Sequence, residues 1–192
     1  MSMPAHSGNV SARRQEAGPA NSMENDRVSI ARQLFAHMAL KPGERVLQLS
    51  CGEGAATRVA AEAVSGGTGM AAGLDISQDR IAQARAESRD VENALFAVGT
   101  AEEIPWRDDF FDGIFSIESF SGYGNLQAVL REVHRALVSG GRLCFVAGSG
   151  EETLHRQLLQ SEGFVEIMSA MVSESKLSGS AEDALLWMAS KP

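Results

Sequence analysis

Cysteine, proline and aromatic residues are all scarce in this sequence. Its 192 residues include two cysteines, five prolines and one tyrosine, and aromatic side chains make up 6% of the chain. Two cysteines cannot build a disulfide framework, and Cys51 and Cys144 both lie in apolar stretches, which suits a reducing compartment. We therefore expect a hydrophobic core, not cross-links, to hold the fold together.

Long hydrophobic runs and excess positive charge are also absent. No segment approaches the roughly 18 apolar residues of a membrane span, and the N-terminus lacks the apolar centre of a signal peptide. The chain carries 17 Lys and Arg against 25 Asp and Glu, a net charge of -8. This charge repels a phosphate backbone or an anionic membrane. The sequence therefore predicts a cytoplasmic protein that binds neither nucleic acid nor membrane.

The four histidines do not form a metal-binding pattern. His6, His37 and His155 have no cysteine or second histidine at ligand spacing, so we expect no metal site. His134 is offset from the apolar face of its predicted helix, which favours a solvated side chain.

Apolar stretches of two kinds alternate along most of the chain. We predict strands at 45–50, 70–75, 94–98, 112–118 and 142–147, and helices at 26–40, 55–64, 78–88 and 125–138. Alternation of this kind implies a mainly parallel sheet with helices on both faces. The tail differs, because a helix at 151–160 is followed by two apolar strands at 164–172 and 184–189, which suggests an antiparallel pair at a sheet edge.

The domain organisation is simple. Residues 1–23 are rich in Ser, Ala, Gly, Asn and Pro without apolar periodicity, so we predict a disordered leader there. Residues 24–192 are expected to form a single domain, because no internal repeat or second core is visible.

A ligand-binding corner is the most informative local feature. The apolar run from Val46 ends in the turn Ser50–Gly54 and continues into an alanine-rich helix, an order of elements that places backbone N–H groups at a ligand. Asp75 ends a second apolar run about 20 residues downstream, the spacing that brings a carboxylate to a ribose. Together the two features point to an adenosine-containing ligand.

Four segments in order resemble the class I S-adenosylmethionine-dependent methyltransferases, most of all the small-molecule methyltransferases. They are Lys41–Gly54, Gly73–Ser77, Gly99–Asp112 and Glu132–Gly141, and the resemblance covers about residues 26–190. It implies an α/β fold, Rossmann-like and doubly wound, in three layers around a seven-stranded, mainly parallel sheet whose last strand is antiparallel. It also implies S-adenosylmethionine as the cofactor.

The resemblance assigns the cofactor-binding residues position by position. It places the methionine part of the cofactor at the Ser50–Gly54 turn, the ribose hydroxyls on Asp75 and the adenine ring at Thr100–Glu102, with the Ala101 N–H as a donor to the ring. The complete expected set is Gln48, Ser50, Cys51, Gly52, Gly54, Asp75, Ile76, Thr100, Ala101, Glu102 and Ile117.

Three residues depart from the family pattern. Gln48 stands where the family has an acidic residue, Ser50 replaces the first glycine of its Gly-x-Gly-x-Gly signature, and Thr100 replaces an aspartate. Two carboxylates are thereby lost near a cationic sulfonium ligand. Cys51 is expected to be a packing residue, because no basic residue adjoins it to lower its pKa.

Few residues are available to cover the acceptor side of the expected site. The connections after the fourth and fifth strands leave little material for a lid, so the helix at 26–40 is the one sizeable element that could close over the site. We expect an acceptor pocket that is open or completed by a second subunit, which would make the protein a homodimer. Glu118, as a general base, and Tyr123, as a substrate contact, are the candidate catalytic residues.

Three functions remain open at this point. The favoured one is methyl transfer to a small-molecule acceptor, achieved mainly by proximity and orientation. The alternative is a catalytically inactive binding or scaffold protein that keeps the fold, suggested by the three departures and the missing lid. A dinucleotide-dependent oxidoreductase is disfavoured, because the turn lacks the Gly-x-Gly-x-x-Gly spacing.

Overall fold

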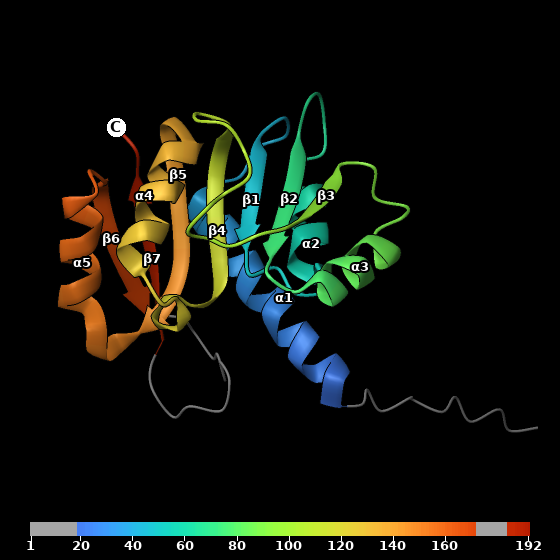
Figure 1. Ribbon diagram of the computed structural model, residues 1–192, viewed down its shortest axis with the longest axis horizontal. Coiled ribbons are helices and arrows are strands. Elements are labelled where there is room, and N and C mark those ends of the chain that lie inside the picture. Colours follow the sequence, from blue (N-terminus) through green and yellow to red (C-terminus); the bar gives the residue numbers. More distant parts are fainter. Residues whose placement is uncertain (1–18, 172–183) are drawn as a thin grey trace, which may run out of the picture.

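A seven-stranded sheet forms the centre of the molecule in the computed structural model, which describes residues 19–171 and 184–192. The strands lie in the order β3-β2-β1-β4-β5-β7-β6, with β3 and β6 at the two edges (Figure 1). Their bounds are β1 Arg45–Leu49, β2 Met70–Asp75, β3 Ala94–Val98, β4 Phe111–Ser119, β5 Leu137–Gly148, β6 Val165–Met171 and β7 Ala184–Ser190.

The strand directions follow the prediction. Neighbouring strands from β3 to β5 run parallel, whereas β7 runs antiparallel to both β5 and β6. The predicted mainly parallel sheet with an antiparallel last strand is therefore confirmed. The connection between β6 and β7, residues 172–183, lies outside the described residues.

Helices cover both faces of the sheet (Figure 1). Their bounds are α1 Pro19–Met38, α2 Ala55–Ala63, α3 Gln78–Glu87, α4 Leu126–Ala136 and α5 Glu152–Ser161, with short 3₁₀ turns at Phe120–Gly122 and Ser149–Glu151. α1 and α2 share one hydrophobic cluster, and α4 and α5 share another, so the three predicted layers are present. None of the described helices is long and apolar enough to cross a membrane.

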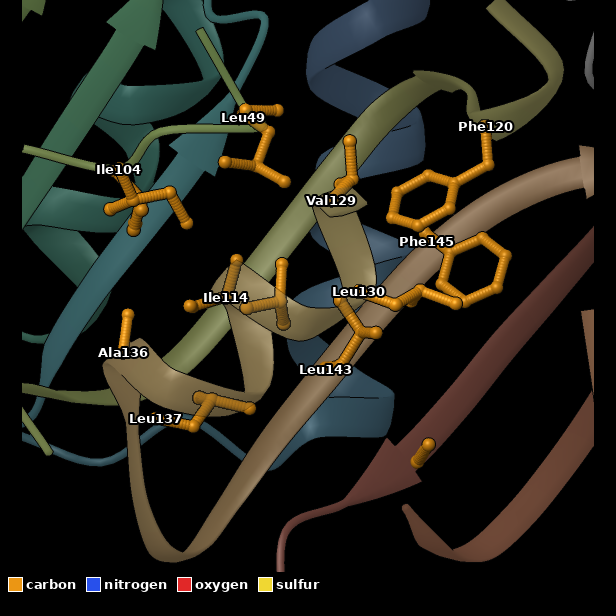
Figure 2. Packing of buried hydrophobic residues seen from close by; sticks show 14 of the residues in the cluster. Leu49, Ile104, Ile114, Phe120, Val129, Leu130, Ala136, Leu137, Leu143 and Phe145 are labelled. Carbon is orange, nitrogen blue, oxygen red and sulfur yellow. The ribbon is translucent and has the colours of Figure 1, made fainter. Parts of the chain in front are cut away.

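Alternation along the strands divides the core between the two faces. On β1, Val46 packs in the cluster with α1 and α2, whereas the next residue, Leu47, packs in the cluster with α4 and α5. Figure 2 shows the second cluster, in which Val129 and Leu130 of α4 lie against Ile114 and Phe145 of the sheet. Strands buried on both faces explain the continuous apolar runs in the sequence.

Local sequence signals set the helix starts. The Ser77 hydroxyl accepts a hydrogen bond from the Arg80 N–H and caps α3, and the Asn125 side chain accepts one from the Ala128 N–H and caps α4. Gly54 precedes α2 with φ at 81°, the left-handed conformation that glycine adopts without strain.

Three details differ from the sequence-based expectation. α1 begins at Pro19, so residues 19–23 are helical although we predicted them to be part of the leader; proline fits the first turn, where its missing N–H costs no bond. Residues 1–18 of that leader lie outside the description. α4 ends at Ala136 and β5 begins at Leu137, earlier than predicted, because Leu137 already pairs with Phe111 before the turn at Gly140.

The expectation of a solvated His134 is also wrong. Its ring lies edge-on to Phe164, with the ring centroids 5.2 Å apart, and its Nε2 is shielded from solvent. Burial lowers the pKa of His134, because the charged form loses hydration. The helical periodicity could not show that His134 is covered, because the covering residue, Phe164, lies in a distant segment after α5.

Candidate functional site

The functional site lies at the carboxyl ends of the parallel strands. The chain order of the strands reverses between β1 and β4, which are neighbours in the sheet, and the loops that follow them diverge to opposite faces. A crevice forms at such a switch point in open α/β sheets. The N-terminal half of α1 projects past the same edge (Figure 1).

A cavity of about 570 Å³ occupies this crevice, a volume typical of small-molecule sites. Its walls come from the loops after β1, β2, β3 and β4 and from α1 and α3. The lining residues are Arg27, Ser50, Gly52, Leu74, Asp75, Ile76, Arg80, Gly99, Thr100, Ala101, Glu102, Glu118, Gly122, Tyr123 and Gly124.

The structure therefore brings together most of the predicted residues. The loop residues Ser50 and Gly52, the acid Asp75 with Ile76, the Thr100–Glu102 turn and both catalytic candidates line one cavity. Three separate stretches of sequence that we associated with one ligand thus form one concave surface.

Asp75 is the centre of the site. The residue is 5% exposed, and its two carboxylate oxygens accept hydrogen bonds from the N–H groups of Gly52 at 2.8 Å and Ser77 at 2.9 Å. A carboxylate has about four acceptor positions, so each oxygen keeps capacity for a ligand hydroxyl. The bond to Gly52 also ties the end of β2 to the loop after β1 and fixes the carboxylate in the cavity wall.

The loop after β1 turns by repeated left-handed conformations. Ser50, Gly52 and Gly54 have φ values of 52°, 57° and 81°. A Cβ at Gly52 would point to the guanidinium of Arg27, with 3.7 Å to Nη1, inside the cavity. A Cβ at Gly54 would instead meet the ring of Phe96 at 2.5 Å. The space beside Gly54 is thus filled by the Phe96 ring of the protein itself.

Four predicted cofactor residues, Gln48, Cys51, Gly54 and Ile117, do not line the cavity. Gln48 is 1% exposed and its Oε1 accepts a 2.6 Å hydrogen bond from the Thr57 hydroxyl, which fastens β1 to α2. Ile117 packs in the core. These side chains contact the interior of the protein and not the cavity. The sequence could not show this, because a strand-end position alone does not say which face a side chain takes.

Cys51 is a packing residue, as expected. Its sulfur lies against Gly73, where a Cβ would come within 2.7 Å. Burial, followed by the negative charge of Asp75, raises the pKa of the Cys51 thiol to about 12. The thiol therefore stays protonated and unreactive at neutral pH.

Tyr123 joins the loop after β4 to the loop after β1. Its hydroxyl lies 3.0 Å from the Ser50 hydroxyl and 3.5 Å from that of Ser116. Burial raises the pKa of Tyr123, and the two serine bonds oppose that shift, so the phenol remains protonated at neutral pH. Ser50, the departure from the family glycine, thus has a partner that the sequence pattern could not show.

Arg27 and Glu118 form an ion pair at the mouth of the cavity. The Arg27 Nη2 lies 2.7 Å from the Glu118 Oε1, and each side chain is 42% exposed. Arg27 belongs to α1, the element that we expected to approach the site. Its arginine had no motif to identify it, because the contact depends on how α1 crosses the sheet edge.

The wall formed by Thr100–Glu102 is held in place by α4. Arg135 donates to the carbonyl oxygens of Ile104 and Trp106, both at 2.9 Å, while Glu132 accepts from the Ile104 N–H at 2.9 Å. Hydrogen bonding to Arg135 lowers the pKa of Glu132. The segment Glu132–Gly141, which resembles the family motif, therefore supports the site from outside the cavity.

Residues missed by the sequence analysis complete the lining. Arg27, Leu74, Arg80, Gly99, Gly122 and Gly124 face the cavity but were not predicted. Gly122 and Gly124 belong to a loop that we expected to face the acceptor, so their position gave a partial signal. Within the described residues, no group of three or more His, Cys, Asp or Glu could hold a metal ion.

Comparison with known proteins gives one family match and many relatives. A family model described as a methyltransferase domain matches residues 40–185. Demethylmenaquinone methyltransferase of Lysinibacillus sphaericus is 35% identical over 128 residues, which cover 65% of this chain and 53% of the relative. The 2-phytyl-1,4-naphtoquinone methyltransferase of Synechococcus elongatus is 33% identical over 127 residues, covering 62% and 54%. The chain thus spans about half the length of these relatives.

Solved structures agree on the fold. A structure described as a SAM-dependent methyltransferase from Aquifex aeolicus superposes with a TM-score of 0.73 at 17% sequence identity. The superposition covers 92% of this chain and all of that one, 100%. The seven-stranded architecture is therefore shared over nearly the whole length.

Proposed function

Because the chain belongs to the methyltransferase domain family, we propose that it transfers a methyl group from S-adenosylmethionine to a small-molecule acceptor. The quinone-related names of its relatives support an acceptor of small size.

The observation that carries the proposal is Asp75, a residue 5% exposed that lines the cavity and whose carboxylate is fixed by the Gly52 N–H. A vicinal pair of ribose hydroxyls can donate to its two oxygens. Ala101, in the loop after β3, lines the same cavity, and its N–H has no acceptor within the described hydrogen bonds, so it is available to an adenine ring nitrogen. The residues present therefore fit the cofactor.

S-adenosylmethionine supplies an electrophilic methyl group on a positively charged sulfur. The chain contributes position: Asp75 and the Ser50–Gly54 loop hold one reactant, and the loop around Tyr123 faces the other. We assign Glu118 to accept a proton from the acceptor and Tyr123 to contact it.

The assembly and location proposed for this chain follow the same reasoning. We propose a homodimer, because the loop after β4 adds just Gly122, Tyr123 and Gly124 to the described lining of the cavity, and a second subunit would complete the acceptor side. We propose a cytoplasmic location, because the two cysteines, Cys51 and Cys144, are both free thiols.

A binding or scaffold protein without catalysis is the second candidate. The neutral, buried Gln48 and the neutral Thr100 favour it, because both replace acidic residues that would attract a sulfonium cation. This candidate predicts weak cofactor binding and no methyl transfer to any acceptor.

Isothermal titration with S-adenosylmethionine and S-adenosylhomocysteine tests the proposed function. We expect micromolar binding for the natural sequence and a loss of at least tenfold in Asp75→Ala, because a charge-assisted pair of hydrogen bonds is removed. Asp79→Ala is the matched control, since Asp79 is an exposed carboxylate four residues away in α3 that does not line the cavity.

The second step is a screen of quinol and phenol acceptors for methylated product by mass spectrometry. Binding with product supports the enzyme. Weak binding without product in any acceptor class favours the binding or scaffold protein, and no binding up to millimolar ligand contradicts the cofactor assignment.

A further inference from the structure

The Arg27 guanidinium lies between the Glu118 carboxylate and the loop after β1. Its Nη2 contacts the Glu118 carboxylate at 2.7 Å, while its Nη1 is the nearest atom to the position that a Cβ on Gly52 would take, at 3.7 Å. The guanidinium therefore bridges from the end of β4 to the loop after β1. Both the arginine and the glutamate line the cavity.

Breaking the ion pair between Arg27 and Glu118 costs little stability. Both side chains are 42% exposed, and exposed pairs of this kind contribute little to stability because water and salt compete for each charge. Arg27 is also on α1, outside the sheet, so its side chain can change partner without disturbing a strand. An arginine presents several donors in a planar fork and suits a second carboxylate equally well.

The positions of the lining residues indicate which part of the proposed cofactor would supply such a carboxylate. Asp75 marks the ribose position, and its hydrogen bond partner Gly52 marks the neighbouring loop, where the amino-acid end of the cofactor is proposed to lie. The lining residues of the described chain include two cations, Arg27 and Arg80, and three carboxylates, Asp75, Glu102 and Glu118. Of the two arginines, Arg27 is the one that reaches Gly52.

We propose that Arg27 exchanges ion-pair partners: Glu118 holds it in the free protein, and the α-carboxylate of the bound cofactor takes it over. This inference rests on the proposed function. The exchange replaces one pair by another, and it leaves Glu118 unpaired beside Tyr123, facing the acceptor. Glu118 thus competes with the ligand before binding and becomes available to the acceptor afterwards, which makes cofactor-first binding the favoured order.

The proposal predicts effects of opposite sign for two partners of one ion pair. Glu118→Gln removes the competitor, so S-adenosylhomocysteine should bind about threefold to tenfold more tightly. Arg27→Gln removes the cation, so the same ligand should bind at least tenfold more weakly. A pair that merely stabilised the fold would make both variants weaker.

A truncated ligand supplies the internal control. 5′-Methylthioadenosine keeps adenine, ribose and sulfur but has no amino-acid carboxylate, so its affinity should be the same within about twofold in the natural protein and both variants. Arg32→Gln, which removes an exposed arginine of the same helix, should change neither ligand's affinity. Thermal melts of each variant show that the fold is retained.

Titration calorimetry of the two ligands against these proteins decides the matter. Opposite shifts for S-adenosylhomocysteine, with none for methylthioadenosine, support the exchange. Equal shifts for both ligands, or a Glu118→Gln variant that binds S-adenosylhomocysteine no more tightly, overturn it while leaving the proposed function in place. A natural protein that binds neither ligand overturns both.

Discussion

Gly54 illustrates how a motif residue can serve the fold instead of the ligand. Its φ of 81° is left-handed, and its missing Cβ leaves room for the Phe96 ring, which a Cβ would approach to 2.5 Å. The ring packs in turn with Cys51 and with Ile81 and Ala84 of α3. The glycine thus lets the loop after β1 lie directly on β3 and α3.

Gly54→Ala should therefore destabilise the protein. We expect a loss on the order of 1–3 kcal/mol in the free energy of unfolding, because the alanine is both strained in the left-handed region and in collision with an aromatic ring. Urea denaturation measures the change. Gly124→Ala is the matched control, since no atom lies within 4 Å of its added Cβ, and its stability should stay within about 0.5 kcal/mol of the natural protein. Equal effects at both positions would contradict this account.

At the same scale, the sequence located Asp75 but not its partners. The acid could be found because its distance from the glycine turn is set by the length of one strand–helix–strand unit. Three contacts at the site join residues that are far apart in the chain. They are the Gly52–Asp75 bond, the contact of Ser50 with Tyr123 and the approach of Arg27 to Gly52. Pattern and spacing describe each segment alone, so these contacts required the structure.

Among the helices, α5 carries a buried titratable group. His155 is 1% exposed and lies beside Phe145 of β5 and Trp187 of β7, with ring centroids 5.7 Å and 5.8 Å away. Burial lowers its pKa from the ordinary value of 6.5, while Glu151 partly opposes the shift. The folded protein therefore holds the imidazole neutral below the pH at which the unfolded chain protonates it.

This difference makes the docking of α5 sensitive to acid. Below pH 6.5 the unfolded state binds more protons than the folded state, so the contribution of His155 to stability falls as the pH falls, by at most about 1.4 kcal/mol per pH unit. We expect the melting temperature of His155→Phe to depend less on pH between 7.5 and 5.5 than that of the natural protein.

The exposed His37 of α1 offers a matched histidine for the same series. His37→Gln should reproduce the natural pH dependence. If His155→Phe follows the same curve as His37→Gln, the buried histidine is not the group that responds to acid in this range.

Element prediction succeeded where one segment carried the whole signal. β1, β2 and β4 each concentrate apolar residues in one short stretch, so the sequence predicted these strands. The start of β5 was not, because Leu137 belongs to the strand only through pairing with Phe111. The prediction of a solvated His134 was wrong for the same reason, since Phe164 covers the His134 ring from a distant segment.

For the whole molecule, ligand binding should appear as thermal stability. A ligand that binds only the folded state at one hundred times its Kd adds about 2.7 kcal/mol, which raises the melting temperature of a domain of this size by about 5–10 °C. We expect S-adenosylhomocysteine to produce this rise in the natural protein and not in Asp75→Ala. Differential scanning calorimetry checks it, and an unchanged melting temperature at saturating ligand would contradict a preformed cofactor site.

The sequence by itself determined the α/β class, the order of strands and helices, the antiparallel ending and the chemical identity of the cavity's central acid. These follow from periodicity and spacing within short segments, which the backbone geometry of helices and strands enforces locally. Only the tertiary structure decided which side chains face the cavity. It turned Gln48 and Cys51 inward, paired Ser50 with Tyr123 and brought Arg27 to Glu118. Those contacts depend on how separate elements cross and pack, and no single stretch of sequence contains that information.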